Sequence, residues 1–304
     1  MARAWLNGRL LELPGDAGSA GLSADSRSAG DDVPAIQAAD RGFLLGDGLF
    51  ETMRAYGGHV FRLRDHLARL GAGLERVGIE VPYDLEGAVL ETLAANDGVG
   101  DSALRLTVTR GAGGLGLLPP AASPATVLVT ARPYHPDPGW YDHGIGADWA
   151  RGRLDEQRAT AGLKQLGYLE AILAVREAAA AGLDDALFLD SVGHVAEAAA
   201  SNVFLVVGHA LRTPPLACGV LPGITRATVL ELAPARGLEL REEPTYPRVL
   251  HDASEAFLTS SLRELVPLVR VGDRTIGNGR PGPVTLRLLE DYRRLAGSPA
   301  EGAP

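Results

Sequence analysis

Lys164 is the first residue to consider, because it is the only lysine among the 29 basic residues of this 304-residue chain. A lysine amine can lose its proton and attack a carbonyl carbon, whereas an arginine guanidinium stays charged at any working pH. A composition biased toward arginine would also leave a single lysine by chance. The surrounding sequence therefore has to decide between the two explanations.

A lysine that binds an aldehyde cofactor needs partner groups, and the sequence offers a candidate for each. Residues 221–225 (LPGIT) enter a predicted helix, whose first amides can bind a phosphate group. Residues 259–261 (TSS) form a second hydroxyl cluster at the end of a predicted strand. Either cluster could equally be an ordinary helix cap. Glu197 lies among small residues between apolar strands, where a carboxylate needs a partner such as a protonated ring nitrogen.

Other kinds of chemistry find less support in the sequence. Gly111, Gly113 and Gly116 match a dinucleotide-binding pattern, but Pro119 and Pro120 follow and prevent the helix that this pattern requires. The seven histidines are scattered and show no ligand spacing, so we expect no catalytic metal. The sequence predicts neither a nucleotide-binding dehydrogenase nor a metal enzyme.

Composition limits the partners and the setting of the protein. A net charge of −9 provides no positive surface for nucleic acid. Cys218 is the single cysteine and cannot form an internal disulfide, which favours a cytoplasmic setting. We find no signal-peptide core and no apolar run approaching about 18 residues, so we expect no membrane association.

Strands and helices intermix without a regular alternation, which favours an α+β fold over a doubly wound parallel sheet. In the first half we expect a hairpin around Asn7-Gly8, then strands at 49–56, 103–109 and 125–133 and helices at 64–75 and 84–95. In the second half we expect strands at 145–150, 185–190, 202–207 and 255–261, a helix at 165–181 and another after residue 221.

The chain should form two domains. We expect a small N-terminal domain at residues 1–133, a connection at 134–146 and a larger cofactor-binding domain at 147–304. Residues 13–39 are expected to be a flexible insertion, because most of this stretch is small, polar and aperiodic.

Six segments in a fixed order resemble the fold-type IV, or class IV, family of pyridoxal-phosphate enzymes. They are residues 40–54 (DRGFLLGDGLFETMR), 66–70, 162–174, 184–204, 219–226 and 255–268. This family includes D-amino-acid and branched-chain aminotransferases and aminodeoxychorismate lyases. The resemblance implies a two-domain α+β fold, pyridoxal 5′-phosphate held between the domains, and usually a homodimer.

The resemblance also implies roles for particular residues. Lys164 would form the Schiff base with the cofactor, Glu197 would face the ring nitrogen, and Tyr168 would donate a hydrogen bond to the phenolic oxygen. Leu221 would pack against the ring. The phosphate ligands would be Arg69, Ile224, Thr225, Ser260 and Ser261.

The substrate pocket departs from part of the family. Leu115 stands where lyases and several D-amino-acid aminotransferases have an arginine for the substrate carboxylate. The carboxylate would then bind Arg54, Arg105 or Arg110, or backbone amides. Arg54 is the first choice, because it would share a strand face with Phe50 and Thr52, which we also expect to contact the substrate.

We therefore expect an aminotransferase that moves an amino group between an amino acid and a 2-oxo acid. The donor would be of the D-amino-acid or branched-chain type, with (R)-primary amines as a further possibility. The alternative is an aminodeoxychorismate lyase that releases pyruvate and 4-aminobenzoate. A protein that binds the cofactor without turnover is disfavoured, because Lys164 and Glu197 are both present.

Overall fold

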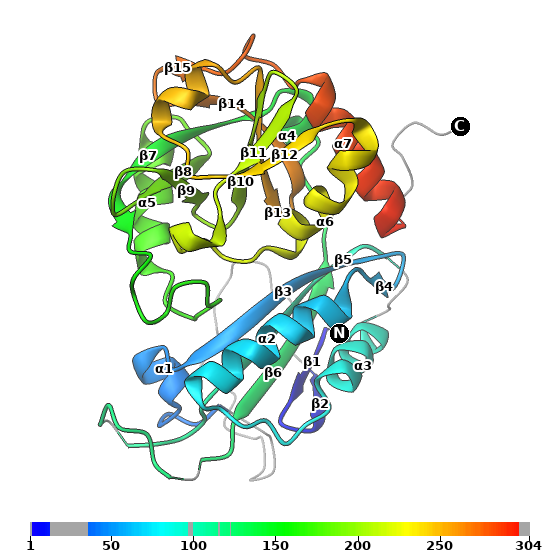
Figure 1. Cartoon of the computed structure of the whole chain (residues 1–304). Coiled ribbons are helices and arrows are strands. Elements are labelled where there is room, and N and C mark those ends of the chain that lie inside the picture. The colour runs from blue at the N-terminus through cyan, green and yellow to red at the C-terminus, as the bar shows by residue number, and fades with distance from the viewer. Residues whose placement is uncertain (1, 13–35, 97–99, 115, 122, 298–304) are drawn as a thin grey trace. The chain divides into compact units, whose positions relative to one another are not determined.

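A computed structural model describes residues 2–12, 36–96, 100–114, 116–121 and 123–297, which belong to two compact units (Figure 1). The first unit comprises Met1–His135 together with Lys164–Leu166, and the second comprises Pro136–Leu163 and Gly167–Pro304. Most of the expected insertion at 13–39 lies outside the described residues. Both units mix helices and strands, so the two-domain α+β prediction is confirmed.

The first unit is built on an antiparallel six-stranded sheet in the order β2-β1-β6-β5-β3-β4. Asn7 and Gly8 both adopt positive φ values, 48° and 93°, as a tight hairpin turn requires. The predicted hairpin and strands are confirmed. Their bounds are β1 (Arg3–Leu6), β2 (Arg9–Glu12), β3 (Gly48–Tyr56), β4 (His59–Val60), β5 (Ser102–Thr109) and β6 (Thr126–Pro133).

Two helices pack on this sheet, α2 (Leu63–Val77) on β3 and α3 (Leu85–Ala95) on β1 and β6 (Figure 1). In α2 the residues Leu70 and Leu74 recur at helical spacing and are buried, and the helix ends at Gly78, whose φ is 64°. Both helices lie within two residues of their predicted bounds. A short helix, α1 (Arg41–Leu45), precedes β3 and was not predicted, because five residues give no periodic signal.

The second unit contains a mixed nine-stranded sheet. Strand β9 pairs with both β8 and β10, so β10, β13, β14, β7, β8 and β9 form a closed ring. Phe204 and Phe257 stack in its core with ring centres 5.1 Å apart. The strands are β7 (Ile145–Leu154), β8 (Asp185–Asp190), β9 (Val195–Ala198), β10 (Asn202–Val207), β11 (Ala210–Thr213), β12 (Glu239–Glu242), β13 (Glu255–Ser260), β14 (Glu264–Val271) and β15 (Arg274–Thr275).

The helices of the second unit include two that differ from the sequence predictions. Helix α5 (Leu169–Ala180) begins four residues later than expected, because Lys164–Leu166 lie along β3 instead. Helix α7 (Pro283–Ala296) had no prediction; the Glu255 carboxylate accepts hydrogen bonds from its first-turn amides. The others are α4 (Gly139–Asp142), α6 (Ile224–Leu232) and the short helices η1 (Leu216–Cys218), η2 (Ala233–Arg236) and η3 (Pro247–His251).

Within the part of the chain that the structure describes, no helix combines the length and apolar character needed to cross a bilayer.

Candidate active site

Lys164 is held by its main chain against strand β3 of the first unit. The Phe50 amide donates a 3.0 Å hydrogen bond to the Lys164 carbonyl oxygen, and the Leu166 amide donates one of 3.3 Å to the Gly48 carbonyl oxygen. This approach requires a glycine at position 48, because a Cβ there would lie 2.5 Å from the Val108 carbonyl oxygen and 2.9 Å from Leu166. The Nζ atom of Lys164 lies 4.5 Å from the centre of the Phe50 ring. Strand β3 therefore positions the amine.

Arg105 contacts the same aromatic ring as Lys164. Its guanidinium carbon lies 3.7 Å from the centre of the Phe50 ring, and its Nε donates a 3.2 Å hydrogen bond to Thr107 Oγ1. In the β3–β5 register, Phe50 lies opposite Thr107, and Thr52 lies opposite Arg105. These four side chains share one face of the sheet. Arg105 is exposed there, so the face presents an amine and a guanidinium beside one ring.

Arg69 is fixed by a buried carboxylate on the opposite face of β3. Glu51 Oε1 accepts a 2.8 Å hydrogen bond from Arg69 Nε, and Glu51 Oε2 lies 2.7 Å from His66 Nδ1. Burial raises the pKa of the Glu51 carboxyl, but hydrogen bonds from His66 and Arg69 outweigh it and hold that pKa below its usual value. Burial also lowers the pKa of His66. The Arg69 side chain keeps 12% of its surface exposed, so it can serve as an oriented cation.

The other two arginines proposed for a substrate carboxylate lie in separate networks. Arg54 forms a 2.8 Å ion pair with Asp101, and its guanidinium lies 4.4 Å from the centre of the Tyr56 ring. Arg110 binds Asp47 at 2.8 Å and donates to the carbonyl oxygens of residues 77 and 78. Both arginines are largely buried, unlike Arg105.

Arg41 organises the glycine-rich loop after β5, a role that sequence analysis missed. Its side chain is 3% exposed and donates to the carbonyl oxygens of Gly114, Gly116 and Leu117 at 3.0, 2.7 and 3.1 Å. Its Nε also binds Asp47 at 2.8 Å. The sequence signal for this role was the motif at residues 40–42, which belongs to the first segment of the family resemblance. Leu115, the predicted pocket residue of this loop, lies outside the described residues.

Glu197 of the second unit is held by a main-chain amide and by a side chain that sequence analysis missed. Its Oε2 atom accepts a 2.9 Å hydrogen bond from the Leu221 amide and one of 3.2 Å from Asn202 Nδ2. Asn202 Nδ2 also donates to the Leu221 carbonyl oxygen at 2.9 Å. The Asn202 amide thus joins β9, β10 and the segment before α6. Its only sequence signal was a polar residue at the start of an apolar strand.

The N-terminus of α6 is left open by its sequence. Gly223 is the N-cap residue and supplies no side-chain hydrogen bond, and the first amides of a helix have no partner within the helix. A Cβ at position 223 would lie 2.0 Å from Asn202 Oδ1, so this approach needs glycine. Ile224 begins the helix and Thr225 is 3% exposed. Such an end is suited to an anion.

The hydroxyl cluster at the end of β13 contains an unsatisfied buried group. Thr259 Oγ1 is buried and has no hydrogen-bond partner among the described residues, which a bound polar group would correct. Thr259 lies opposite Asn202 in the β10–β13 register. Ser260 Oγ accepts a 3.3 Å hydrogen bond from the Arg263 amide. Open helix amides, hydroxyls and a tethered carboxylate in this unit fit a phosphate-bearing cofactor with a basic ring nitrogen.

The predicted site residues are divided between the two units. The first unit holds Lys164, Arg69, Phe50, Thr52, Arg54, Arg105 and Arg110. The second holds Tyr168, Glu197, Leu221, Ile224, Thr225, Ser260 and Ser261. Within the units, direct contacts join Lys164 and Arg105 to Phe50, and Glu197 to Leu221. Tyr168 is half-buried just before α5, and its role stays a prediction.

Comparison with known proteins gives consistent matches over most of the chain. The family model described as amino-transferase class IV matches residues 48–271. A Methanocaldococcus jannaschii protein provisionally named a branched-chain-amino-acid aminotransferase is 38% identical over 86% of this chain and 91% of its own. A Bacillus licheniformis D-alanine aminotransferase is 31% identical over 83% of this chain and 88% of its own. A T.th. branched-chain amino acid aminotransferase solved with pyridoxamine 5′-phosphate superposes with a TM-score of 0.84 at 28% identity, and the match covers 99% of this chain and 96% of that one.

Proposed function

Because this chain belongs to the class IV aminotransferases and has pyridoxal 5′-phosphate as its cofactor, we propose that it transfers the amino group of an α-amino acid with an apolar side chain to a 2-oxo acid. The relatives' names include branched-chain and D-amino-acid donors, and the proposal covers both types. One observation carries it: the exposed Arg105 guanidinium and the Lys164 amine lie on the same Phe50 ring.

The cofactor ligands in this proposal are the residues that the family resemblance implies. Its phosphate would bind Arg69, the first amides of α6 at Ile224 and Thr225, and the hydroxyls of Ser260 and Ser261. Leu221 would pack against its ring. Support comes from the anchoring of Arg69 by Glu51 and from the open N-terminus of α6. Glu197 would hold the proton on the ring nitrogen, and Tyr168 would donate to the phenolic oxygen.

Proton transfer would fall to Lys164. When bound, pyridoxal phosphate accepts the electron pair released as the substrate Cα–H bond breaks. The Nζ atom of Lys164 would take the proton from the substrate Cα and deliver it to the C4′ carbon of the cofactor, as general base and then general acid. Its main-chain hydrogen bonds to β3 limit where Nζ can go.

Arg105 would receive the substrate carboxylate. A guanidinium can bind a carboxylate through two parallel hydrogen bonds, which orients the donor as well as holding it. Arg105 is exposed and lies on the Lys164 face of the sheet, whereas the Arg54 side chain is only 5% exposed. This difference in exposure favours Arg105 over Arg54, which was the first choice from the sequence.

We also propose a homodimer with a second copy of this chain. Phe43, Leu117 and Leu118 have 82, 85 and 89% of their surface exposed. Arg41 links the two segments that carry them, since it begins α1 and bonds to the Leu117 carbonyl oxygen. An exposed apolar patch of this kind is typical of a protein interface. The cytoplasmic setting stays a prediction from the single cysteine.

A donor panel tests the function directly. The holoenzyme is mixed with L- and D-amino acids and with (R)- and (S)-phenylethylamine, and conversion of the cofactor to its amine form is followed by absorbance. Conversion by apolar amino acids is expected. Release of pyruvate from aminodeoxychorismate without conversion by any donor would instead identify a lyase.

Paired arginine variants test the carboxylate ligand. Losing the charged partner of a bound carboxylate costs about 2–5 kcal/mol, so Arg105→Gln should lower kcat/KM for amino acids at least about 30-fold. Any turnover of phenylethylamine should be spared. Arg54→Gln is the matched control; a loss confined to amino acids in this variant alone would assign the carboxylate to Arg54.

A further inference from the structure

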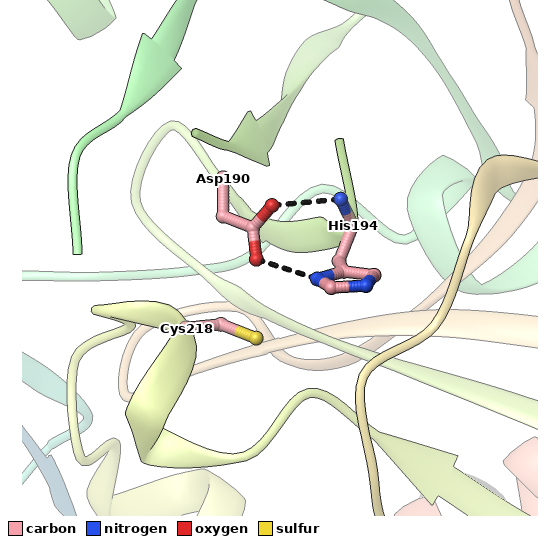
Figure 2. Close-up of side chains that lie close together, drawn as sticks. All are labelled: Asp190, His194 and Cys218. Atoms are coloured by element: carbon pink, nitrogen blue, oxygen red, sulfur yellow. Dashed lines mark hydrogen bonds and ion pairs between the residues drawn. The ribbon is translucent and has the colours of Figure 1, made fainter. Parts of the chain in front are cut away.

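A second group of reactive side chains lies in the second unit and has no part in the proposed reaction. Asp190 ends β8, His194 lies in the turn before β9, and Cys218 ends the short helix η1 (Figure 2). Their ligand atoms, a carboxylate oxygen, an imidazole nitrogen and the thiol sulfur, all lie within 4.8 Å of one another. The sequence could not reveal this group, because Cys218 is 24 residues from His194 and only the fold unites them.

The Asp190 carboxylate is fixed by its own turn. Its Oδ1 atom accepts hydrogen bonds from the amides of Val192 and His194 at 3.1 and 2.7 Å, and its Oδ2 atom lies 2.9 Å from His194 Nδ1. The Tyr246 ring packs on the His194 ring with centres 4.5 Å apart. Two of the three ligands are thus held in place before any ion binds.

Cys218 is the third ligand and approaches from the apolar side. It is 4% exposed and belongs to a cluster that includes Phe188 and Val220. Burial, together with a hydrogen bond to Asp190, raises the pKa of its thiol to about 11. Burial among apolar side chains limits the access of oxidants to this thiol. A metal cation can displace the thiol proton.

We propose that Asp190, His194 and Cys218 form a binding site for a zinc ion, separate from the cofactor site. Sulfur, nitrogen and oxygen ligands in one tetrahedral set suit Zn²⁺, whereas Mg²⁺ and Ca²⁺ prefer oxygen alone. Zinc bonds of about 2.0–2.3 Å place ligand atoms roughly 3.3–3.8 Å apart. The three ligand atoms here lie within 4.8 Å of one another, so small side-chain shifts would bring them to that spacing. The S–H bond breaks as the Zn–S bond forms, and that proton leaves to solvent. The proton between His194 Nδ1 and Asp190 Oδ2 moves to His194 Nε2, so that the neutral imidazole binds the ion through Nδ1. The Asp190 and thiolate charges balance the ion, and water fills the fourth position.

A zinc ion at this site would influence Glu197 and Leu221, two of the proposed cofactor ligands, through the segments that carry them. His194 lies three residues before Glu197, and Cys218 lies three residues before Leu221, whose amide donates to Glu197. An ion that binds His194 and Cys218 would hold these two segments together and so stabilise the Leu221–Glu197 hydrogen bond. This geometry gives zinc a positioning role and not a catalytic one.

Calorimetric titration of the holoenzyme with Zn²⁺, after treatment with a chelator, tests the proposal. One ion per chain is expected, and X-ray absorption at the zinc edge should show one sulfur ligand at about 2.3 Å. Cys218→Ser and His194→Asn should each weaken zinc binding at least about tenfold. The control is His209→Asn, which removes an exposed histidine of the same unit outside the cluster.

Two results would overturn the site. One is no saturable zinc binding by a chain that turns over its substrates normally. The other is binding that stays unchanged in Cys218→Ser and His194→Asn but weakens in His209→Asn, which would identify a surface site. Circular dichroism confirms that each variant is folded. All readouts except turnover are independent of the aminotransferase activity, so failure of either proposal leaves the other testable.

Discussion

Replacing Arg41 by alanine should loosen the glycine-rich loop and lower the stability of the first unit. The change removes an ion pair with Asp47 and three hydrogen bonds to loop carbonyl oxygens. Asp47 keeps its 2.8 Å contact with Arg110, so no carboxylate is left unpaired. Gly114, Gly116 and Leu117 are exposed, so water can replace part of the lost hydrogen bonding.

The expected magnitude follows from these partners. A hydrogen bond to a charged group contributes about 1.5–3 kcal/mol, and removing one member of a buried ion pair costs about 3–5 kcal/mol. Because Asp47 keeps Arg110 and water reaches the loop, we expect a loss of about 2–4 kcal/mol in the free energy of unfolding. Arg41→Lys should lose nearly as much, since a single ammonium cannot reach four acceptors in different directions.

Urea unfolding measures the global loss, and hydrogen exchange of amides at residues 111–118 measures the local one. Arg3→Ala is the matched control, because its ion pair with Glu12 is exposed and should contribute less than about 1 kcal/mol. If Arg41→Ala were no more destabilising than Arg3→Ala and loop exchange were unchanged, the reasoning about Arg41 would be wrong.

Three further predictions concern Lys164, Arg69 and His66 of the first unit. Lys164→Ala should abolish the covalent attachment of the cofactor aldehyde to the only lysine side chain and lower turnover by several orders of magnitude. Mass spectrometry after borohydride reduction detects the attachment. Substantial residual activity would contradict the proposed role of this amine. Arg69→Ala should weaken cofactor affinity roughly 10- to 150-fold, since a charge-assisted hydrogen bond contributes about 1.5–3 kcal/mol. Excess cofactor should restore the activity of this variant. An unchanged affinity would show that Arg69 does not bind the phosphate. Burial lowers the pKa of His66 in the folded protein, so the unfolded chain binds the proton first and the free energy of unfolding should fall as the pH drops below 6.5. Urea unfolding at a series of pH values measures this dependence. In His66→Gln the slope of the unfolding free energy against pH should be shallower, by up to about 1.4 kcal/mol per pH unit.

Sequence reasoning predicted elements well where local signals were strong. The Asn7-Gly8 turn and the apolar periodicity of α2 each depend on neighbouring residues alone. It placed the start of α5 too early, because residues 164–166 have helix-compatible types but gain hydrogen bonds from β3, which is distant in sequence.

The polar network was the part of the site that sequence could not predict. Asn202 contributes through a contact with a segment 19 residues away, and Arg41 through contacts more than 70 residues away. No local pattern distinguishes such residues from ordinary surface polar groups. Arg54 illustrates the converse, because its strand face was read correctly but Asp101, its partner, could not be foreseen.

The pairing of residues 164–166 with β3 has a consequence for selectivity. Two backbone hydrogen bonds hold residues 164–166 on β3, and the Lys164 amine and the Arg105 guanidinium both contact the Phe50 ring, which limits the distance between them. Together they would select donors whose amino nitrogen and carboxylate are separated by the distance found in an α-amino acid. Donors with one extra methylene between these groups, such as β-amino acids, would present one end correctly and miss the other. The protein would thereby prefer α-amino acids to β-amino acids whatever side chain the donor carries.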